Sequence, residues 1–181
     1  MNMLSNSLVL ITGASSGIGR SCAYRFAEGG ARLLLLARRI DRLETLAREL
    51  RDRYSADVYY AQIDVRDAVS IAQFFTYLPE KWRTIDVLIN NAGLSRGLDK
   101  IYEGNIADWE EMIDTNVKGL LYVSRAVIPG MVERKKGTII NIGSIAGHEV
   151  YPNGNVYCAT KHAVDAITKG MRMDLVDTPL R

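Results

Sequence analysis

The sequence predicts an α/β fold built on one parallel sheet. Within its 181 residues, short apolar stretches alternate with longer stretches of helical periodicity, five times in succession. Such alternation indicates parallel strands joined by right-handed helical crossovers. The first apolar stretch runs into a glycine-rich turn, and polar residues follow several of the others. We therefore predict a Rossmann-like doubly wound sheet of order 3-2-1-4-5, with a ligand site outside the carboxyl ends of its strands.

The first element is a strand expected over residues 8–11, followed at once by a turn with the spacing Gly-x-x-x-Gly-x-Gly. Glycines let the backbone approach a diphosphate closely, and the helix expected over residues 20–28 offers amide donors at its start. The commoner dinucleotide fingerprint is Gly-x-Gly-x-x-Gly, so one alternative is a turn that only connects strand to helix. Its place after the first strand favours nucleotide binding. The predicted binding residues are Gly13, Ser15, Ser16, Gly17, Ile18 and Gly19.

The second strand, expected over residues 32–37, selects the cofactor. Its four consecutive leucines indicate a central strand that is buried on both faces. The strand is followed by Arg38 and Arg39, where an NAD-binding domain usually has an acid that holds the ribose 2′-hydroxyl. A guanidinium suits a 2′-phosphate, so NADP(H) is the predicted cofactor. The alternative is two solvated arginines at the start of a helix.

A helix–strand–helix unit follows. The first helix is expected over residues 41–54, and its Asp41 and Glu44 have the spacing of a capping motif. A strand over residues 58–63 and a helix over residues 67–78 come next.

Polar and small residues follow the third and fourth strands. Asp64 stands at the end of the third strand, where it either accepts a hydrogen bond from an adenine amino group or caps the next helix. The fourth strand, expected over residues 87–90, opens into Asn91, Ala92 and Gly93. Such small residues let a ligand pass close to the backbone, so both strand ends are predicted to line the same site.

A long helix is predicted next, beginning at Asn105 or Asp108 and carrying one apolar stripe. Asn116 interrupts this stripe. Since a buried amide must be hydrogen bonded, we expect its side chain to bond a helix carbonyl or to hold a water. Pro129 is expected to kink or loosen the helix late in its course.

The last unit is the one on which the chemistry depends. A buried strand over residues 138–142 is expected to deliver Ser144 at its carboxyl end, and the following helix carries Tyr157 and Lys161. Residues four apart share one face of a helix, so the Lys161 ammonium is expected near the Tyr157 phenol. Free tyrosine loses its proton only near pH ~10, and a cation within about 4 to 6 Å favours the phenolate. The pair is predicted to exchange a proton near neutral pH; the alternative is a half-buried aromatic ring beside a solvated charge.

Composition argues against several other classes of protein. The formal net charge is +2 and the basic residues are scattered, so no nucleic-acid partner is expected. No apolar run approaches the ~20 residues of a membrane helix, and Met1 to Leu10 lacks the order of a signal peptide. A cytoplasmic protein without a membrane partner is therefore expected. Cys22 and Cys158 lack paired spacing and the two histidines form no cluster, so no metal site is predicted.

Several of these motifs occur together in a fixed order: Thr12-Gly13-x-x-x-Gly17-Ile18-Gly19, Asn90-Asn91-Ala92-Gly93, Asn116, Ser144 and Tyr157-x-x-x-Lys161. In this combination the chain resembles the short-chain dehydrogenase/reductase family over essentially its whole length. Residues 108–116 and 126–132 are similar to the branch of NADP-dependent 3-hydroxy acid (serine 3-) dehydrogenases.

The resemblance implies a role for each catalytic residue. Tyr157 would donate or accept the proton, and Lys161 would also bind the nicotinamide ribose. Ser144 would hold the substrate oxygen, and Asn116 would anchor a water of the proton relay. The cofactor contacts that the resemblance adds are Asp64, Val65 and Asn91.

The resemblance also implies an activity: an NADP(H)-dependent oxidoreductase that transfers a hydride between nicotinamide and a secondary alcohol or ketone, with a small 3-hydroxy acid such as serine as substrate. The alternative is an NADP(H)-binding sensor or scaffold without turnover. Family members continue into further strands and a substrate lid, so residues 1–181 are expected to be a single NADP-binding domain that lacks them. A homotetramer or homodimer is expected, and a strip of small residues would allow close helix packing: Ala159, Ala163, Ala166 and Gly170.

Overall fold

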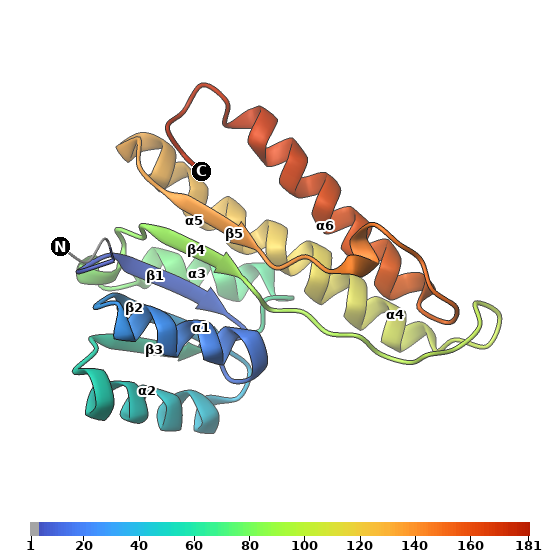
Figure 1. The fold of residues 1–181 in the computed structure, drawn as a ribbon, viewed down its shortest axis with the longest axis horizontal. Coiled ribbons are helices and arrows are strands. Elements are labelled where there is room, and N and C mark those ends of the chain that lie inside the picture. Colours follow the sequence, from blue (N-terminus) through green and yellow to red (C-terminus); the bar gives the residue numbers. More distant parts are fainter. Residues whose placement is uncertain (1–3) are drawn as a thin grey trace.

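The computed structural model describes residues 4–181; Met1 to Met3, part of the stretch considered above for a signal peptide, lie outside it. The described residues form one sheet of order β3-β2-β1-β4-β5, which confirms the predicted topology (Figure 1). All four pairings are parallel, so the carboxyl ends of the strands meet at one edge. The strands are β1 (Leu8–Thr12), β2 (Arg32–Ala37), β3 (Val58–Gln62), β4 (Val87–Asn90) and β5 (Thr138–Asn141).

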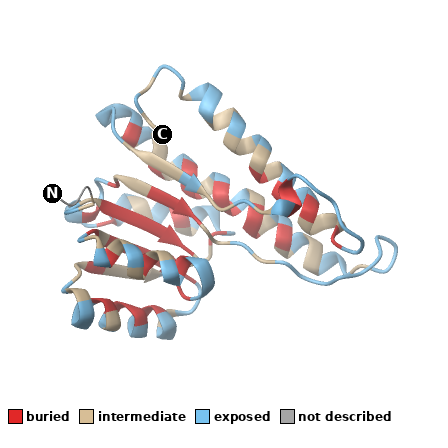
Figure 2. Cartoon of the chain, in the orientation of Figure 1, coloured by how far each residue is buried: buried red, intermediate tan, exposed pale blue. Residues whose placement is uncertain are grey.

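Helices cover both faces of the sheet because successive strand side chains point to opposite sides. Val9 and Ile11 of β1 belong to the core beneath α1 (Gly17–Glu28) and α2 (Ile40–Tyr54). Leu8 and Leu10 of the same strand belong to the opposite core, beneath α3 (Ala68–Tyr77) and α5 (Leu120–Arg134). Figure 2 shows the buried residues concentrated in the central strands and on the helix faces turned toward them.

The two strands that the sequence described as buried differ in the structure. The four leucines of β2 have no exposed surface, as predicted. The prediction of a buried fifth strand is wrong, because Ile140 of β5 is 38% exposed. β5 is one of the two outermost strands, and among the described residues it pairs with β4 alone, apart from backbone hydrogen bonds that join Arg181 to Gly137 and Ile139.

Two helix starts also differ from expectation. α1 begins at Gly17, so the last two glycines of the turn form its first residues. The capping motif predicted at Asp41 and Glu44 is wrong, because the N-cap of α2 is Arg39 and no side chain caps it. Asp41 lies inside the first turn, where its charge alone favours the positive end of the helix.

The long helix begins after Asn105, whose side chain accepts a hydrogen bond from the Ala107 amide and caps α4 (Ile106–Ile113). A π-helical turn over Asp114–Gly119 then joins α4 to α5. α5 continues past Pro129 to Arg134, and the π turn is a departure from α geometry earlier in the helix, so the kink or loosening at Pro129 stays a prediction.

The remaining elements complete the carboxyl half of the described chain. Two short 3-10 helices, η1 (Glu80–Trp82) and η3 (Ile145–Gly147), precede β4 and α6 (Asn155–Asp174) respectively. α6 packs against η3, α4 and the π turn, away from α1 and α2 (Figure 1). No helix formed by residues 4–181 is long and apolar enough to span a membrane.

Candidate active site

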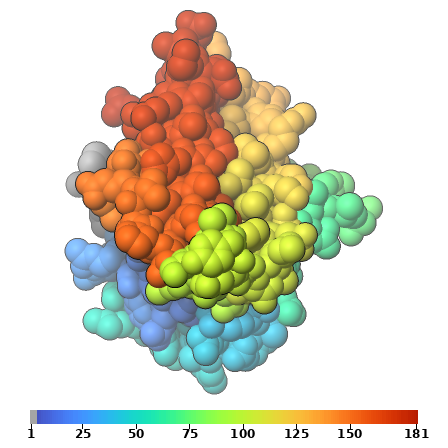
Figure 3. Space-filling view, turned by 90° about the vertical axis from the view of Figure 1, so that its right-hand side faces the viewer, coloured from blue at the N-terminus to red at the C-terminus, as the bar shows by residue number. Residues whose placement is uncertain are grey.

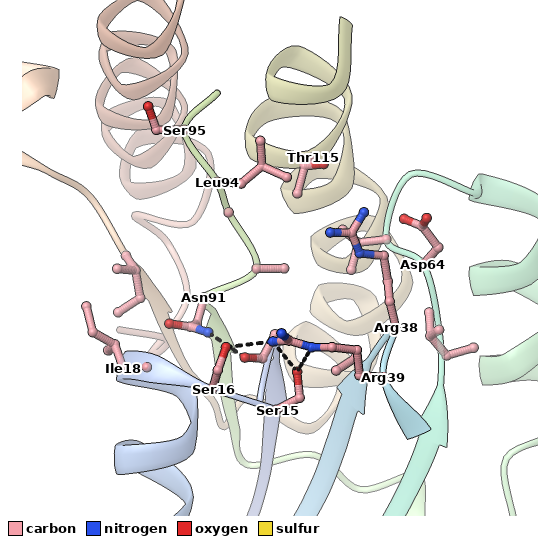
Figure 4. Close-up of a pocket in the computed structure, with 18 of the residues that line it drawn as sticks. Ser15, Ser16, Ile18, Arg38, Arg39, Asp64, Asn91, Leu94, Ser95 and Thr115 are labelled. Atoms are coloured by element: carbon pink, nitrogen blue, oxygen red, sulfur yellow. Dashed lines mark hydrogen bonds between the residues drawn. The ribbon is translucent and has the colours of Figure 1, made fainter. Parts of the chain in front are cut away.

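A cleft of about 780 Å³ opens at the edge where the strands end. Figure 4 shows Arg38 and Asp64 on one side of it, with Ile18 and Asn91 on the other. Most of the predicted site residues line the cleft: Gly13, Ser15, Ser16, Gly17, Ile18, Arg38, Arg39, Asp64, Val65, Asn91, Ala92, Gly93, Tyr157 and Lys161. The predicted residues that are not part of its lining are Gly19, Asn116 and Ser144.

The glycine-rich turn is held against the end of β4. The Thr12 hydroxyl accepts hydrogen bonds from the amides of Asn91 (3.1 Å) and Ala92 (3.0 Å), while the Asn91 side chain donates to the Thr12 carbonyl (2.8 Å). Gly13 has φ of +64°, a conformation that suits glycine. The first residues of α1 line the cleft, so its amide groups and helix dipole favour a bound anion there.

Gly19 supports the turn from behind, and we expect Gly19→Ala to destabilise the protein. A Cβ at this position would lie 2.4 Å from Asn91 Nδ2 and 2.7 Å from the Gly13 carbonyl oxygen. Overpacking of this kind costs about 1–3 kcal/mol, so the midpoint of thermal unfolding should fall. Gly170→Ala is the matched control, because a Cβ there has no atom within 4 Å and alanine favours the helix. Equal midpoints for the two variants would contradict this account of Gly19.

Arg38 and Arg39 both have protein partners at the wall of the cleft. Arg39 Nη2 donates to Ser16 Oγ (2.7 Å) and Ser15 Oγ (3.0 Å), so its guanidinium spans the glycine-rich turn (Figure 4). Arg38 Nη1 donates to Glu111 Oε1 on α4 (2.9 Å). The two positive charges therefore lie at the cleft, but both side chains are exposed, so the phosphate contact of these arginines stays a prediction.

Asp64 does not cap the next helix, which was one of its two predicted roles. Asp67 caps α3 instead, since its Oδ1 accepts from the amides of Val69 and Ser70, each at 3.0 Å. Asp64 accepts from the Arg66 guanidinium, with the shortest contact at 2.6 Å. Partial burial acts to raise the pKa of Asp64, but the hydrogen bonds and charge of Arg66 outweigh it and lower the pKa. The carboxylate is thus an ionised acceptor at the wall of the cleft, and its adenine contact stays a prediction.

Lys161 and Tyr157 both line the cleft. Lys161 Nζ is 6.0 Å from the centroid of the Tyr157 ring and donates to the Ile142 carbonyl at 2.8 Å. Lys161 is only 8% exposed, and burial lowers its pKa. The alternative of a solvated lysine is therefore wrong. The ammonium is a fixed cation one helical turn from the phenol, which is the arrangement that the sequence predicted.

Asn116 holds the loop after β4, and its partners do not include the helix carbonyl that was one of the two expectations. Its Oδ1 accepts from the Leu94 amide (2.8 Å), and its Nδ2 donates to the Leu94 carbonyl (2.8 Å) and to Thr160 Oγ1 (3.0 Å). The π turn that contains Asn116 brings its side chain between that loop and α6. The side chain is buried behind the cleft wall rather than in it, and its water-anchoring role stays a prediction.

Ser144 follows the lining residue Gly143, and its side chain is turned toward the backbone. The Ser144 hydroxyl accepts from the Ala146 amide (3.2 Å) and so caps η3. η3 packs closely on α6, since a Cβ at Gly147 would lie 2.8 Å from the Lys161 carbonyl oxygen. The serine is thereby fixed beside the helix that carries the tyrosine and lysine.

Sequence reasoning missed some of the cleft. Leu94 and Ser95 extend the lining segment after β4, which was predicted only as far as Gly93. Ile142 and Gly143 follow β5, just as other lining residues follow their strands. Thr115 had no signal in the sequence apart from its position beside Asn116. Among residues 4–181, its buried hydroxyl has no hydrogen-bond partner, although the residue lines the cleft. A polar atom of this kind suits a bound ligand.

Comparison with known proteins agrees with this geometry. A family model described as short chain dehydrogenase matches residues 7–181. The NADP-dependent 3-hydroxy acid dehydrogenase of Salmonella typhimurium is 49% identical over 174 residues, covering 96% of this chain and 68% of that protein. Its namesake from Schizosaccharomyces pombe is 45% identical over 182 residues, covering 100% of this chain and 70% of that protein.

A solved structure gives the same relationship in three dimensions. The closed form of serine dehydrogenase complexed with NADP+ is 46% identical to this chain and superposes with a TM-score of 0.90. The superposition covers 96% of this chain and 68% of that one. The parallel sheet, the family model and these identities lead to one conclusion: the chain belongs to the short-chain dehydrogenase family.

Proposed function

We propose that the chain, an NADP-dependent oxidoreductase, interconverts a small 3-hydroxy acid with the corresponding carbonyl compound, which is an aldehyde for the primary alcohol of serine and a ketone for a secondary alcohol. The observation that carries this proposal is the buried Lys161 ammonium beside the Tyr157 ring, at the same cleft as the Arg38 and Arg39 guanidinium groups. The cleft therefore joins a proton-transfer pair to a pair of cations that suits a phosphate. The similarity to 3-hydroxy acid dehydrogenases supports the substrate class.

Three features of the cleft suit NADP(H). The turn leaves room for a diphosphate, because Gly13 is in a left-handed conformation and α1 begins at Gly17. The two guanidinium groups suit a 2′-phosphate. The buried Thr115 hydroxyl would gain a partner from a ligand that fills the cleft.

The chain's own groups account for the proton and the orientation of the substrate. Bound NADP(H) supplies or accepts the hydride. Tyr157 takes the proton of the substrate hydroxyl during oxidation and returns it during reduction. The buried Lys161 ammonium lies beside its ring. The Ser144 hydroxyl keeps its own proton free to donate to the substrate oxygen, since its oxygen is the acceptor in the bond to Ala146. Asn116 and Lys161 hold the wall through the Leu94 backbone and the Ile142 carbonyl.

Steady-state absorbance of NADPH tests the substrate class. We expect turnover with serine and with other short 3-hydroxy acids, and weaker turnover with alcohols that lack the carboxylate. Calorimetric titration with NADPH on the same protein separates binding from catalysis. Tight NADPH binding without turnover on any of these alcohols or on simple ketones would favour a sensor or scaffold and contradict the proposal.

We expect neutral substitutions of Arg38 and Arg39 to weaken the binding of NADPH more than the binding of NADH. Charge-assisted hydrogen bonds are each worth about 1.5–3 kcal/mol, so Arg39→Gln should raise the Kd for NADPH by at least roughly tenfold. The Kd for NADH should change much less, because it has no 2′-phosphate. Arg42→Gln, an exposed position on α2, is the matched control. Equal losses for the two cofactors in Arg38→Gln and Arg39→Gln would contradict the phosphate assignment.

We further propose that the protein is a cytoplasmic homodimer or homotetramer in which α6 takes part in association. Ala159 and Ala166 of the small-residue strip are exposed, and Ala163 and Gly170 are half-buried, so the sheet does not cover this face. Small side chains allow close helix approach. In Figure 3 the surface of α6 (orange to red) adjoins that of α4 and α5 (yellow), which gives a neighbouring helical surface for a second copy. Light scattering after size-exclusion chromatography measures the mass, and a monomer would contradict this proposal.

A further inference from the structure

Three guanidinium groups converge on one carboxylate, that of Glu111 on α4. Arg38 Nη1 lies 2.9 Å from Glu111 Oε1, Arg96 Nε lies 2.9 Å from Oε2, and Arg66 Nη1 lies 3.4 Å from Oε1. The Glu111 side chain is 19% exposed. Hydrogen bonds from Arg38 and Arg96 lower the pKa of Glu111, so the carboxylate is ionised at neutral pH. The sequence showed no sign of this cluster, because its members are distant along the chain.

The cluster lies directly behind the end of the cleft where the 2′-phosphate is proposed to bind. Arg38 lines the cleft, and so does Asp64, which is the other partner of Arg66. Arg96 comes from the loop after β4. Its guanidinium is held by the carboxylate of Glu111. Glu111 thus joins the ends of β2 and β3 to that loop through its three arginines.

A carboxylate and a phosphate compete for the same guanidinium because both offer paired oxygens to its fork of N–H donors. Nη1 of Arg38 is already committed to Glu111, so a 2′-phosphate has to share this side chain or draw it away. Release of Arg38 leaves Glu111 with Arg96 and Arg66, so the carboxylate does not become an unpaired buried charge. Arg38 can therefore move from Glu111 to a phosphate without leaving a buried charge unpaired. The move still costs the protein the attraction between Arg38 and Glu111.

We propose that Glu111 is a specificity-determining residue that holds Arg38 in the absence of a 2′-phosphate and so moderates the preference for NADP(H) over NAD(H). The inference rests on the proposed role of Arg38 at the 2′-phosphate. With NAD(H), Arg38 keeps its carboxylate partner and no guanidinium is left unpaired beside a neutral 2′-hydroxyl. With NADP(H), the phosphate shares Arg38 with Glu111 or draws it away, and in both cases the negative charge of Glu111 opposes that of the phosphate. Removal of the Glu111 charge therefore strengthens binding only of the phosphorylated nucleotide.

Isothermal titration of the whole chain with adenosine 2′,5′-bisphosphate and with adenosine 5′-monophosphate tests this without any turnover. Glu111→Gln is expected to lower the Kd for the bisphosphate by about three- to fivefold, which matches the contribution of a partly exposed ion pair. The Kd for the monophosphate should stay within about twofold of its original value. Glu110→Gln is the matched control, because it removes a negative charge from the exposed residue that precedes Glu111 on α4. It is expected to change neither Kd. The gain should disappear in an Arg38→Gln background. Thermal unfolding of each variant confirms that the chain is folded.

The possible results separate this inference from the proposed function. Three results would each overturn the role of Glu111. The first is a higher Kd for the bisphosphate in Glu111→Gln, and the second is an equal gain in affinity for both nucleotides. The third is the same gain in affinity with and without Arg38. If Arg38→Gln weakens the bisphosphate while Glu111→Gln has no effect, only the present inference fails. If Arg38→Gln leaves the bisphosphate Kd unchanged, the proposed phosphate site fails as well.

Discussion

Tyr157→Phe should lower kcat/KM for NADP(H)-linked turnover by about 10²- to 10⁴-fold, the usual contribution of a positioned acid or base. The ring stays in place and only the hydroxyl is lost, so the Kd for NADPH should change little. The proton of the substrate hydroxyl then loses its assigned acceptor, and the nearby Lys161 ammonium cannot replace it because it is itself a donor. Steady-state kinetics and cofactor titration on the same preparation measure the two effects separately.

Tyr77→Phe is the control for this experiment, because Tyr77 is 80% exposed at the end of α3 and does not line the cleft. Its kcat/KM should equal that of the unchanged protein. Undiminished activity in Tyr157→Phe would refute the assigned proton role, whereas a joint loss of activity and NADPH binding would point to a disrupted cleft.

Lys161→Met should be nearly as damaging, by about 10²- to 10³-fold in kcat, since it removes a preorganised charge from a water-poor site. The variant also loses the buried cation that lies beside the Tyr157 ring. Lys169→Met is the control on the same helix, because Lys169 is exposed and pairs with Asp165. An undiminished kcat in Lys161→Met would refute the role of this charge in the reaction.

The same variant should change how stability depends on alkaline pH. Burial lowers the pKa of Lys161 in the folded chain, whereas an unfolded lysine titrates near pH ~10.4. Between these two values the unfolded chain binds more protons, so this lysine makes the free energy of unfolding rise with pH. At neutral pH both states are charged and the folded state bears the cost of burying the ammonium.

Urea unfolding from neutral pH up to about pH 10 measures this contribution as a difference between the two proteins. The free energy of unfolding of the unchanged chain, relative to Lys161→Met, should increase toward the alkaline end. A difference that is constant, or that falls as pH rises, would show that this ammonium is not buried at a cost.

Much of the fold and of the cleft could be predicted because both follow from local patterns. The leucines of β2 and the glycines after β1 have clear periodicity and spacing, and parallel topology brings the strand ends to one edge. Tyr157 and Lys161 are one turn apart on a single helix, so their proximity is a local property. β5 was misjudged because apolar composition does not distinguish a central strand from an outermost one.

The partners of polar side chains could not be predicted in the same way. Asn116 had a local expectation, a helix carbonyl, and found the Leu94 backbone and Thr160 instead. The carboxylate of Glu111 was one of many on a helical surface until the fold placed three arginines around it.

Residue order thus specified the sheet, the cofactor-binding edge and the tyrosine–lysine pair, because each depends on spacing within one element or on the rules of parallel topology. The hydrogen-bond and ion-pair partners of Asn116, Asp64 and Glu111 were set by packing between elements. A side chain pairs with whichever group lies within about 3 Å, and the three-dimensional fold alone brings distant groups that close.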